Sequence, residues 1–219
     1  MTGNNTVFIV DDDSAVLDSL TRLLKTAGYT VEAYPSAEAF LASYNPCRPG
    51  CLILDMQMPG MGGLGLQEKL AEGKDIRPII FLTAHATVPT TRLALKQGAF
   101  DLLEKPPNGK ELLAHIKIAL QRDADTRREE IIRIEARKRC ASLTQREQEI
   151  LQLVIAGNSN KDIGYQLGIS HRTVELHRTH IALKTGTKKV VELAAIAQAA
   201  GIASKPTMVE ERPTNQRDG

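Results

Sequence analysis

The 219-residue chain has no tryptophan, only three cysteines, and few aromatic residues, which make up 4% of the total. An odd number of cysteines argues against a disulfide-bonded secreted fold. No apolar run approaches the ~18–20 residues of a membrane-spanning helix, and the polar N-terminus does not resemble a secretory signal peptide. These absences favour a cytoplasmic globular protein without a membrane partner, of a length typical of one or two domains.

The net charge of +2 is unevenly distributed along the chain. Residues 1–120 contain 13 acidic and 11 basic side chains, whereas residues 121–142 and 143–203 each contain seven basic and five acidic ones. A mildly basic second half is typical of nucleic-acid binding. Because Tyr165 is the only aromatic residue after position 100, stacking on RNA or single strands is disfavoured relative to binding of double-stranded DNA.

Short apolar runs alternate with helix-period segments through residue 121 and are not joined by hairpin signals. This pattern predicts a parallel five-stranded sheet with helices on both faces, in the flavodoxin-like strand order 2-1-3-4-5. The predicted strands are 6–10, 30–34, 51–54, 79–82 and 101–103. The predicted helices begin near Ser14 and then cover 37–44, 64–70, 89–96 and 110–120.

Charged and polar residues stand where the predicted strands end. Asp11 and Asp12 follow the first strand, Asp55 ends the third, Thr83 ends the fourth, and Lys105 follows the fifth. Because the carboxyl ends of parallel strands meet at one edge, we expect these side chains to converge. Crowded carboxylates resist ionisation unless a cation neutralises them, and oxygen ligands without histidine or cysteine select Mg²⁺. The pattern therefore predicts a site for Mg²⁺ and a phosphate group.

The first half contains the strings FIVDDD, LILDMQMPGMGG, FLTA and EKP, which resemble the receiver domain of two-component response regulators over residues 6–120. The resemblance implies that Asp55 accepts phosphate from a sensor histidine kinase. It also implies that the chain is not an enzyme beyond self-phosphorylation and dephosphorylation of that residue. By the same resemblance the Mg²⁺ ligands are Asp11 (largely through water), Asp12, Asp55 and the backbone carbonyl of Gln57, and the phosphoryl contacts are Thr83 and Lys105.

Two residues depart from the receiver pattern. Leu102 stands where an aromatic residue usually reports phosphorylation, and Pro107 replaces the phenylalanine that often follows Lys-Pro. A regulator that binds DNA without phosphorylation is therefore one alternative. Another is a phosphatase of the haloacid dehalogenase kind, because Asp11-x-Asp13 after a strand imitates one of its motifs, although such an enzyme has no use for residues 143–201.

The stretch 122–142 lacks glycine and proline and predicts a helical linker. Three times in this stretch an acid precedes a base by four residues, first at Asp123 and Arg127, which is typical of an exposed helix. Ile131 and Ile134 form a short apolar edge. Both a solvated linker and a dimerising helix are compatible with this pattern.

The segment 143–203 predicts four helices without strands, including a helix-turn-helix with Gly168 in the turn. We expect a disordered tail over residues 204–219, which are polar and contain two prolines. The first predicted helix opens at a capping box that starts at Thr144. The second covers 161–167, the third extends from Ser170 to about residue 184, and the fourth covers 188–200.

This segment contains the string LTQREQEILQLVIAGNSNKDIGYQLGISHRTVELHR, which closely resembles the LuxR-type DNA-binding domain. The whole chain thus resembles response regulators of the FixJ/NarL kind, which implies a homodimer on promoter DNA when phosphorylated, with RNA polymerase as a candidate further partner. The third helix would then be the recognition helix. The implied contacts to bases or nearby backbone are Thr173, Val174, Glu175, Arg178 and Thr179, and the implied phosphate contacts are Lys161, Arg172, His177 and Lys184.

Overall fold

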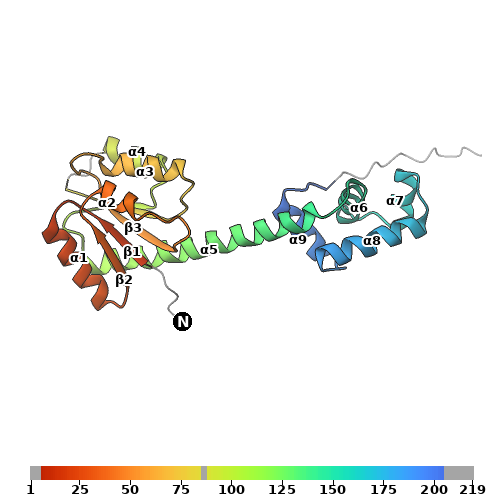
Figure 1. The fold of residues 1–219 in the computed structure, drawn as a ribbon, viewed down its shortest axis with the longest axis horizontal. Helices are drawn as coiled ribbons and strands as arrows, with labels where there is room; N and C mark the ends of the chain where they lie inside the picture. The colour runs from red at the N-terminus through yellow and green to blue at the C-terminus, as the bar shows by residue number, and fades with distance from the viewer. Residues whose placement is uncertain (1–5, 85–87, 205–219) are drawn as a thin grey trace, which may run out of the picture. The chain divides into compact units, whose positions relative to one another are not determined.

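The computed structural model describes residues 6–84 and 88–204, and the chain divides into two compact units after Arg128 (Figure 1). Each unit has a hydrophobic core of its own. The predicted tail, residues 204–219, lies outside the described residues except for Ser204. Among the helices that the structure describes, none is long and apolar enough to cross a membrane.

The first unit is built on a parallel five-stranded sheet with the order β2-β1-β3-β4-β5, which confirms the predicted topology (Figure 1). Every residue of β1, β3 and β4 is buried, because helices cover both faces of the sheet. This burial explains why the strands appear in the sequence as continuous apolar runs. The strands are β1 (Thr6–Val10), β2 (Thr30–Tyr34), β3 (Gly50–Asp55), β4 (Ile79–Thr83) and β5 (Asp101–Glu104).

Side chains of each strand alternate between two apolar clusters on opposite faces of the sheet. In β1, Val7 and Ile9 join the cluster formed with α1 and α5, whereas Phe8 and Val10 join the cluster formed with α2, α3 and α4. The helices of this unit are α1 (Ser14–Thr26), α2 (Ala37–Ala42), α3 (Gly63–Glu72) and α4 (Val88–Lys96), followed by α5 (Gly109–Ala141), which continues beyond residue 128.

A buried ion pair lies at the amino edge of the sheet, just before β4. Nε of Arg77 donates to Oδ2 of Asp75 at 2.9 Å, and both side chains are almost fully buried. The guanidinium carbon lies 4.9 Å from the ring centre of Phe8, 5.2 Å from that of Tyr44 and 5.5 Å from that of Phe40. Aromatic faces stabilise a desolvated cation, so this edge is closed by a matched charge pair inside an aromatic cage.

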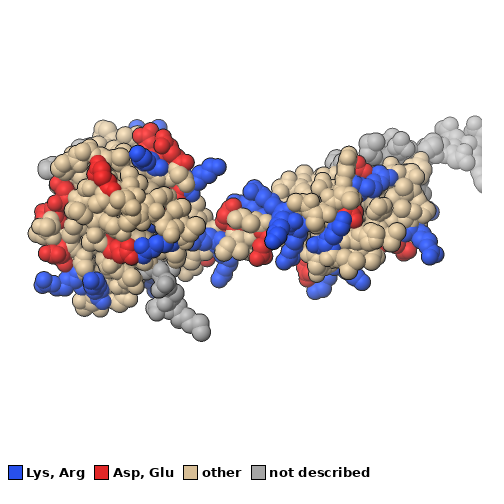
Figure 2. Space-filling model, in the orientation of Figure 1, with Lys and Arg blue, Asp and Glu red and all other residues tan. Residues whose placement is uncertain are grey.

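The structure joins the predicted helix 110–120 and the predicted linker into one helix, α5. The sequence spacing predicts an exposed pair at Asp123 and Arg127, but Asp123 is only 1% exposed, so that prediction is wrong. Its Oδ2 accepts the N–H of Gly50 at 2.9 Å, and Nη2 of Arg127 donates to the carbonyl of Arg48 at 3.0 Å. The pair therefore fastens α5 to the first unit. Basic and acidic side chains are interspersed on the surface of the following stretch of α5 (Figure 2).

The second unit contains four helices after α5 in the part of the chain that is described, which confirms the predicted all-helical domain. Its core includes the fully buried side chains of Ile150, Ile163, Val174 and Ala197, one from each helix. The helices are α6 (Gln145–Ile155), α7 (Asn160–Leu167), α8 (His171–Thr185) and α9 (Val190–Ala200).

Candidate functional site

The carboxyl edge of the sheet brings together four of the residues predicted to form a site. Asp11 follows β1 directly, Asp55 is the last residue of β3, and Thr83 is the last residue of β4. Lys105 follows β5, and its Nζ lies 2.6 Å from Oδ2 of Asp11 and 3.1 Å from Oδ2 of Asp55. The N–H of Lys105 donates to the carbonyl of Thr83 at 2.8 Å, so all four strand ends meet in one place.

Asp12 completes a group of three carboxylates at this edge. Ligand oxygens of Asp11, Asp12 and Asp55 all lie within 4.8 Å of one another. Asp11 and Asp55 are 1% and 6% exposed, whereas Asp12 is open to solvent. An all-oxygen donor set with an open side fits Mg²⁺, which keeps part of its water shell. The N–H of Gln57 lies 3.4 Å from Oδ1 of Asp55, which places Gln57 beside the group.

The charges at this edge do not balance. Burial raises the pKa of Asp55; Lys105 counteracts this effect, and the nearby Asp11 carboxylate adds to it, so the pKa of Asp55 stays above its usual value. Burial alone would lower the pKa of Lys105, but the two carboxylates raise it above its ordinary range. One ammonium group is therefore firmly protonated beside an excess of carboxylates, an arrangement that a further cation would stabilise.

Two local features hold these side chains in place. Asp13 caps α1 by accepting the N–H of Ala15 at 2.8 Å, and its own N–H donates to Oδ1 of Asp11 at 3.0 Å. Gly63 begins α3 next to Asp55, and a Cβ there would lie 2.2 Å from the backbone oxygen of Asp55. The sequence argument missed the role of Gly63, whose only signal is its place at the end of the string LILDMQMPGMGG.

Leu102, at the position where receivers usually carry an aromatic residue, lies in the middle of β5. It is half-buried, pairs with Phe81 in the strand register, and packs against the cluster that contains Ala94 of α4. The preceding Asp101 lies 2.6 Å from Nδ1 of His115 on α5. Leu102 is thus a packing residue on the face of the sheet that α4 covers.

The second unit contains a helix-turn-helix formed by α7 and α8. Ser159 opens α7 with a capping box, and Gly168 ends it in the left-handed region with a φ of 64°. Ser170 then caps α8 by accepting a backbone N–H from its first turn. A Cβ on Gly164 would lie 2.8 Å from the carbonyl oxygen of Ile169, so glycine lets the turn pack closely against α7.

Helix α8 has a buried face and an exposed face. Val174 has no exposed surface and packs in the core with Ile181, one helical repeat of seven residues later. Val174 was predicted to contact DNA, but a fully buried side chain cannot reach a base, so this prediction is wrong. The exposed residues of α8 are His171, Arg172, Glu175, Leu176, Thr179, His180, Leu183 and Lys184.

Some of the predicted DNA-contacting cations have partners inside the unit. Nη1 of Arg178 donates to Oδ1 of Asn160 at 2.8 Å, and Nζ of Lys184 lies 2.6 Å from Oε2 of Glu147. Because a guanidinium and an ammonium each carry several N–H donors, both cations can keep these partners and still contact DNA. Half-buried members of the predicted set are Thr173, His177 and Arg178, and exposed members are Lys161, Arg172, Glu175, Thr179 and Lys184.

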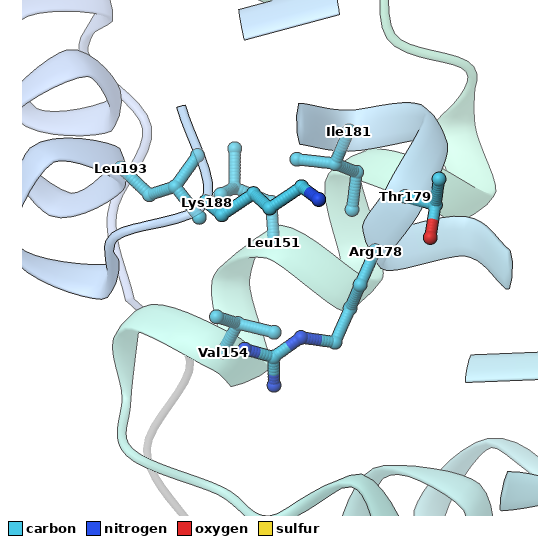
Figure 3. A pocket seen from close by; sticks show the side chains of 7 residues that line it. All are labelled: Leu151, Val154, Arg178, Thr179, Ile181, Lys188 and Leu193. Carbon is cyan, nitrogen blue, oxygen red and sulfur yellow. The ribbon is translucent and has the colours of Figure 1, made fainter. Parts of the chain in front are cut away.

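Arg178 also borders a half-open pocket of about 210 Å³ within the second unit. Figure 3 shows Arg178 and Lys188 extending over apolar side chains of α6, α8 and α9. Two cations above an apolar floor are suited to an anionic group such as a backbone phosphate. The lining residues are Leu151, Val154, Arg178, Thr179, Ile181, Lys188 and Leu193.

Leu176 on α8 is an exposed apolar residue that was not predicted from the sequence as a candidate contact. This side chain is 55% exposed between the exposed residues Glu175 and Thr179. An exposed leucine on such a helix face can contact the methyl group of thymine in the major groove. Its signal in the sequence was an apolar residue two positions after Val174, outside the spacing of the buried face.

The acidic sheet edge and the helix-turn-helix define a class of protein: a regulator with a receiver domain and a DNA-binding domain. Residues 7–117 match the family model described as response regulator receiver domain, and residues 141–197 match the model described as bacterial regulatory proteins, luxR family. The chain belongs to the two-component response regulators that combine these two domains and act as transcriptional regulators.

Full-length relatives support the same family. The chain is 40% identical to the transcriptional regulatory protein FixJ of Azorhizobium caulinodans, over 90% of this chain and 93% of that protein. It is 43% identical to the transcriptional regulatory protein TdiR of Thauera aromatica, over 88% and 85%. Among solved structures, the response regulator StyR matches with a TM-score of 0.79 and 41% identity, over 90% of this chain and 99% of that one. These relatives are named as regulators, not as enzymes.

Proposed function

We propose that Asp55 accepts a phosphoryl group from a histidine imidazole of a sensor kinase. A carboxylate oxygen of Asp55 attacks phosphorus, an acyl phosphate forms, and the bond from phosphorus to the imidazole nitrogen breaks. The observation that carries this proposal is the position of Nζ of Lys105, 3.1 Å from Asp55 and 2.6 Å from Asp11. There Lys105 offsets charge on the phosphoryl oxygens, and Thr83 offers its hydroxyl to them.

We further propose that Asp12, Asp55 and the carbonyl of Gln57 hold Mg²⁺ while Asp11 acts through water. The donor set fits, because three carboxylates provide hard oxygen ligands within 4.8 Å of one another and a single ammonium leaves them undercompensated. When bound, Mg²⁺ would neutralise developing charge on the transferring group. The only covalent chemistry proposed for the chain is the phosphorylation and dephosphorylation of Asp55.

For the second unit, we propose that the exposed face of α8 enters the major groove of promoter DNA. Arg172 and Thr179 are accessible for backbone or base contacts, and Leu176 adds an apolar contact. Lys161 at the start of α7 is placed to neutralise a phosphate. Glu175 then discriminates against bases that present only acceptors to it.

Phosphorylation would connect the two functions by favouring one of two receiver states. In the favoured state two chains form a homodimer and bind adjacent half-sites, which raises the apparent affinity for DNA. Such a dimer would act in the cytoplasm, with RNA polymerase as a candidate further partner. Because Leu102 stands in the usual switch position, this coupling would operate without an aromatic side chain there.

The direct test is phosphate incorporation from a small phosphodonor in the presence of Mg²⁺, measured as a gain in intact mass. We expect the wild-type chain to gain one phosphoryl group and Asp55→Asn to gain none. Asp18→Asn is the matched control, because Asp18 is an exposed residue of α1 outside the acidic group. Equal incorporation in wild type and Asp55→Asn would refute the assignment.

A further inference from the structure

A second group of metal-ligating side chains lies in the DNA-binding unit, away from the acidic edge of the receiver sheet. Glu147 is in the first turn of α6, and His177 and His180 are on α8. Each offers one ligand atom, and these three atoms lie within 4.8 Å of one another. Two imidazole nitrogens and one carboxylate oxygen make a mixed donor set, which differs from the oxygen-only donor set at the edge of the receiver sheet.

The two oxygens of Glu147 have different surroundings. Oε2 accepts the N–H of Thr144 at 2.7 Å and lies 2.6 Å from Nζ of Lys184. Oε1 lies 3.9 Å from Nδ1 of His180. Burial by itself would raise the pKa of Glu147, but Lys184 and Thr144 hold it below the usual value, so the carboxylate is ionised at neutral pH. One oxygen is thus committed to capping α6, and the other faces the histidines.

His177 supplies an independent observation. Its Nδ1 is buried and has no hydrogen-bond partner among the residues that the structure describes. Buried polar atoms in proteins are nearly always paired, so an unpaired ring nitrogen on a member of this group calls for an explanation. A bound cation would provide the missing partner, because a neutral imidazole nitrogen is a metal ligand.

We propose that Glu147, His177 and His180 form a binding site for a zinc-type divalent transition metal. Zinc–ligand distances of about 2.0–2.2 Å place neighbouring tetrahedral ligands about 3.4 Å apart, which is close to the observed 3.9 Å between Glu147 and His180. Imidazole ligands select zinc-type metals over Mg²⁺. Water completes the coordination, as in zinc sites with three protein ligands.

The proposed metal would link α6 to the recognition helix. His177 and His180 belong to α8, so occupancy would fasten that helix to the first turn of α6 and add positive charge beside its exposed face. Metal binding would therefore stabilise the folded DNA-binding unit.

Calorimetric titration of the metal-free, full-length protein with ZnCl₂, in excess Mg²⁺ to occupy the acidic edge, tests the proposal. We expect one zinc ion per chain, and an affinity at least about tenfold weaker in His180→Asn and in His177→Asn. His171→Asn is the matched control: His171 lies on the same helix, is exposed, and is outside the group. We expect this control to bind zinc like wild type.

A second readout separates lost binding from lost folding. His180 is exposed, so metal-free His180→Asn should unfold at the same temperature as the metal-free wild type. At equal concentration, zinc should then raise the unfolding temperature of wild type and of His171→Asn by more than that of His180→Asn. Absence of zinc binding in wild type, or equal binding in His180→Asn, would overturn the proposal.

Discussion

At the amino edge of the receiver sheet, buried Arg77 is matched by a single carboxylate, Asp75, whereas at the carboxyl edge Lys105 faces a group of three carboxylates. The amino edge is enclosed by aromatic rings, and its charges balance. The carboxyl edge has an open side and a surplus of negative charge. Both edges contain buried ions, so burial of charge does not by itself indicate a functional site.

The two edges differ in whether the buried charges have matching counter-ions within the protein. A matched, hydrogen-bonded pair needs no ligand and is expected to contribute to stability alone. An unmatched group is expected to cost stability until a cation or phosphoryl group completes it, as is common where function and stability conflict. Asp123 and Arg127 of α5 form a second matched pair, and Asp123 accepts a hydrogen bond from Gly50 at the start of β3.

Breaking the matched pair at the amino edge should have the largest effect on stability. Arg77→Ala leaves the Asp75 carboxylate buried without a counter-ion, and we expect a loss of about 3–5 kcal/mol in the free energy of unfolding. Urea denaturation measures this loss, and Mg²⁺ should not restore it. Arg22→Ala, an exposed change on α1, is the control and should stay within about 0.5 kcal/mol of wild type.

Removing the ammonium from the carboxyl edge should have a smaller effect that Mg²⁺ can reverse. Lys105→Met leaves Asp11 and Asp55 close together without their cation, at an expected cost of about 1–3 kcal/mol in Mg²⁺-free buffer. Adding Mg²⁺ should stabilise this variant by more than it stabilises wild type. A Mg²⁺ response as small as that of Arg77→Ala would remove the distinction between the two edges.

Neutralising one acid at each edge should change stability in opposite directions. Because the pKa of Asp55 is raised, the folded state favours its neutral form, so Asp55→Asn should stabilise the Mg²⁺-free protein. Asp75→Asn should destabilise it, since Arg77 loses its counter-ion. Chemical denaturation in EDTA measures the free energy of unfolding of both variants. Destabilisation by Asp55→Asn would contradict a surplus of negative charge at the carboxyl edge.

These contrasts show which parts of the structure the sequence could predict. Strand order and the convergence of Asp11, Asp55 and Lys105 follow from the order of βα units, because parallel strands end at one edge. The burial of Asp123 could not be predicted, because spacing along a helix does not reveal which loop packs on it. Val174 could have been recognised as buried from its seven-residue spacing to Ile181.

Ion pairs between residues far apart in the sequence are a second feature that local sequence patterns cannot predict. Lys184 pairs with Glu147, 37 residues away, so its charge is partly satisfied before any DNA is bound. Sequence position alone presents Lys184 as a free cation on a recognition helix. Only the packing of α6 against α8 brings the two residues together.

The smallest expected effect concerns a matched pair that is open to water. Arg48 lowers the pKa of Glu32, and burial opposes it only in part. The stabilisation from a lowered carboxyl pKa is complete above the ordinary value near ~4.3 and is lost as the pH falls through the lower value of the folded state.

Since both side chains of this pair are about one third exposed, we expect Glu32→Gln to cost less than about 1 kcal/mol at neutral pH. Urea midpoints across an acid titration should show the difference between variant and wild type vanishing at low pH. If Glu32→Gln lowered the free energy of unfolding as much as Arg77→Ala, burial of an ion pair would not determine how much the pair contributes to stability.

We expect the unmatched edge of the receiver to control the DNA-binding unit. The most direct measurement is the affinity of the full chain for promoter DNA, with and without beryllofluoride and Mg²⁺, together with the molar mass in solution. We expect tighter binding and a dimeric mass for wild type, and neither change for Asp55→Asn. Equal affinity of wild type with and without beryllofluoride, or an equal gain in Asp55→Asn, would contradict the claim.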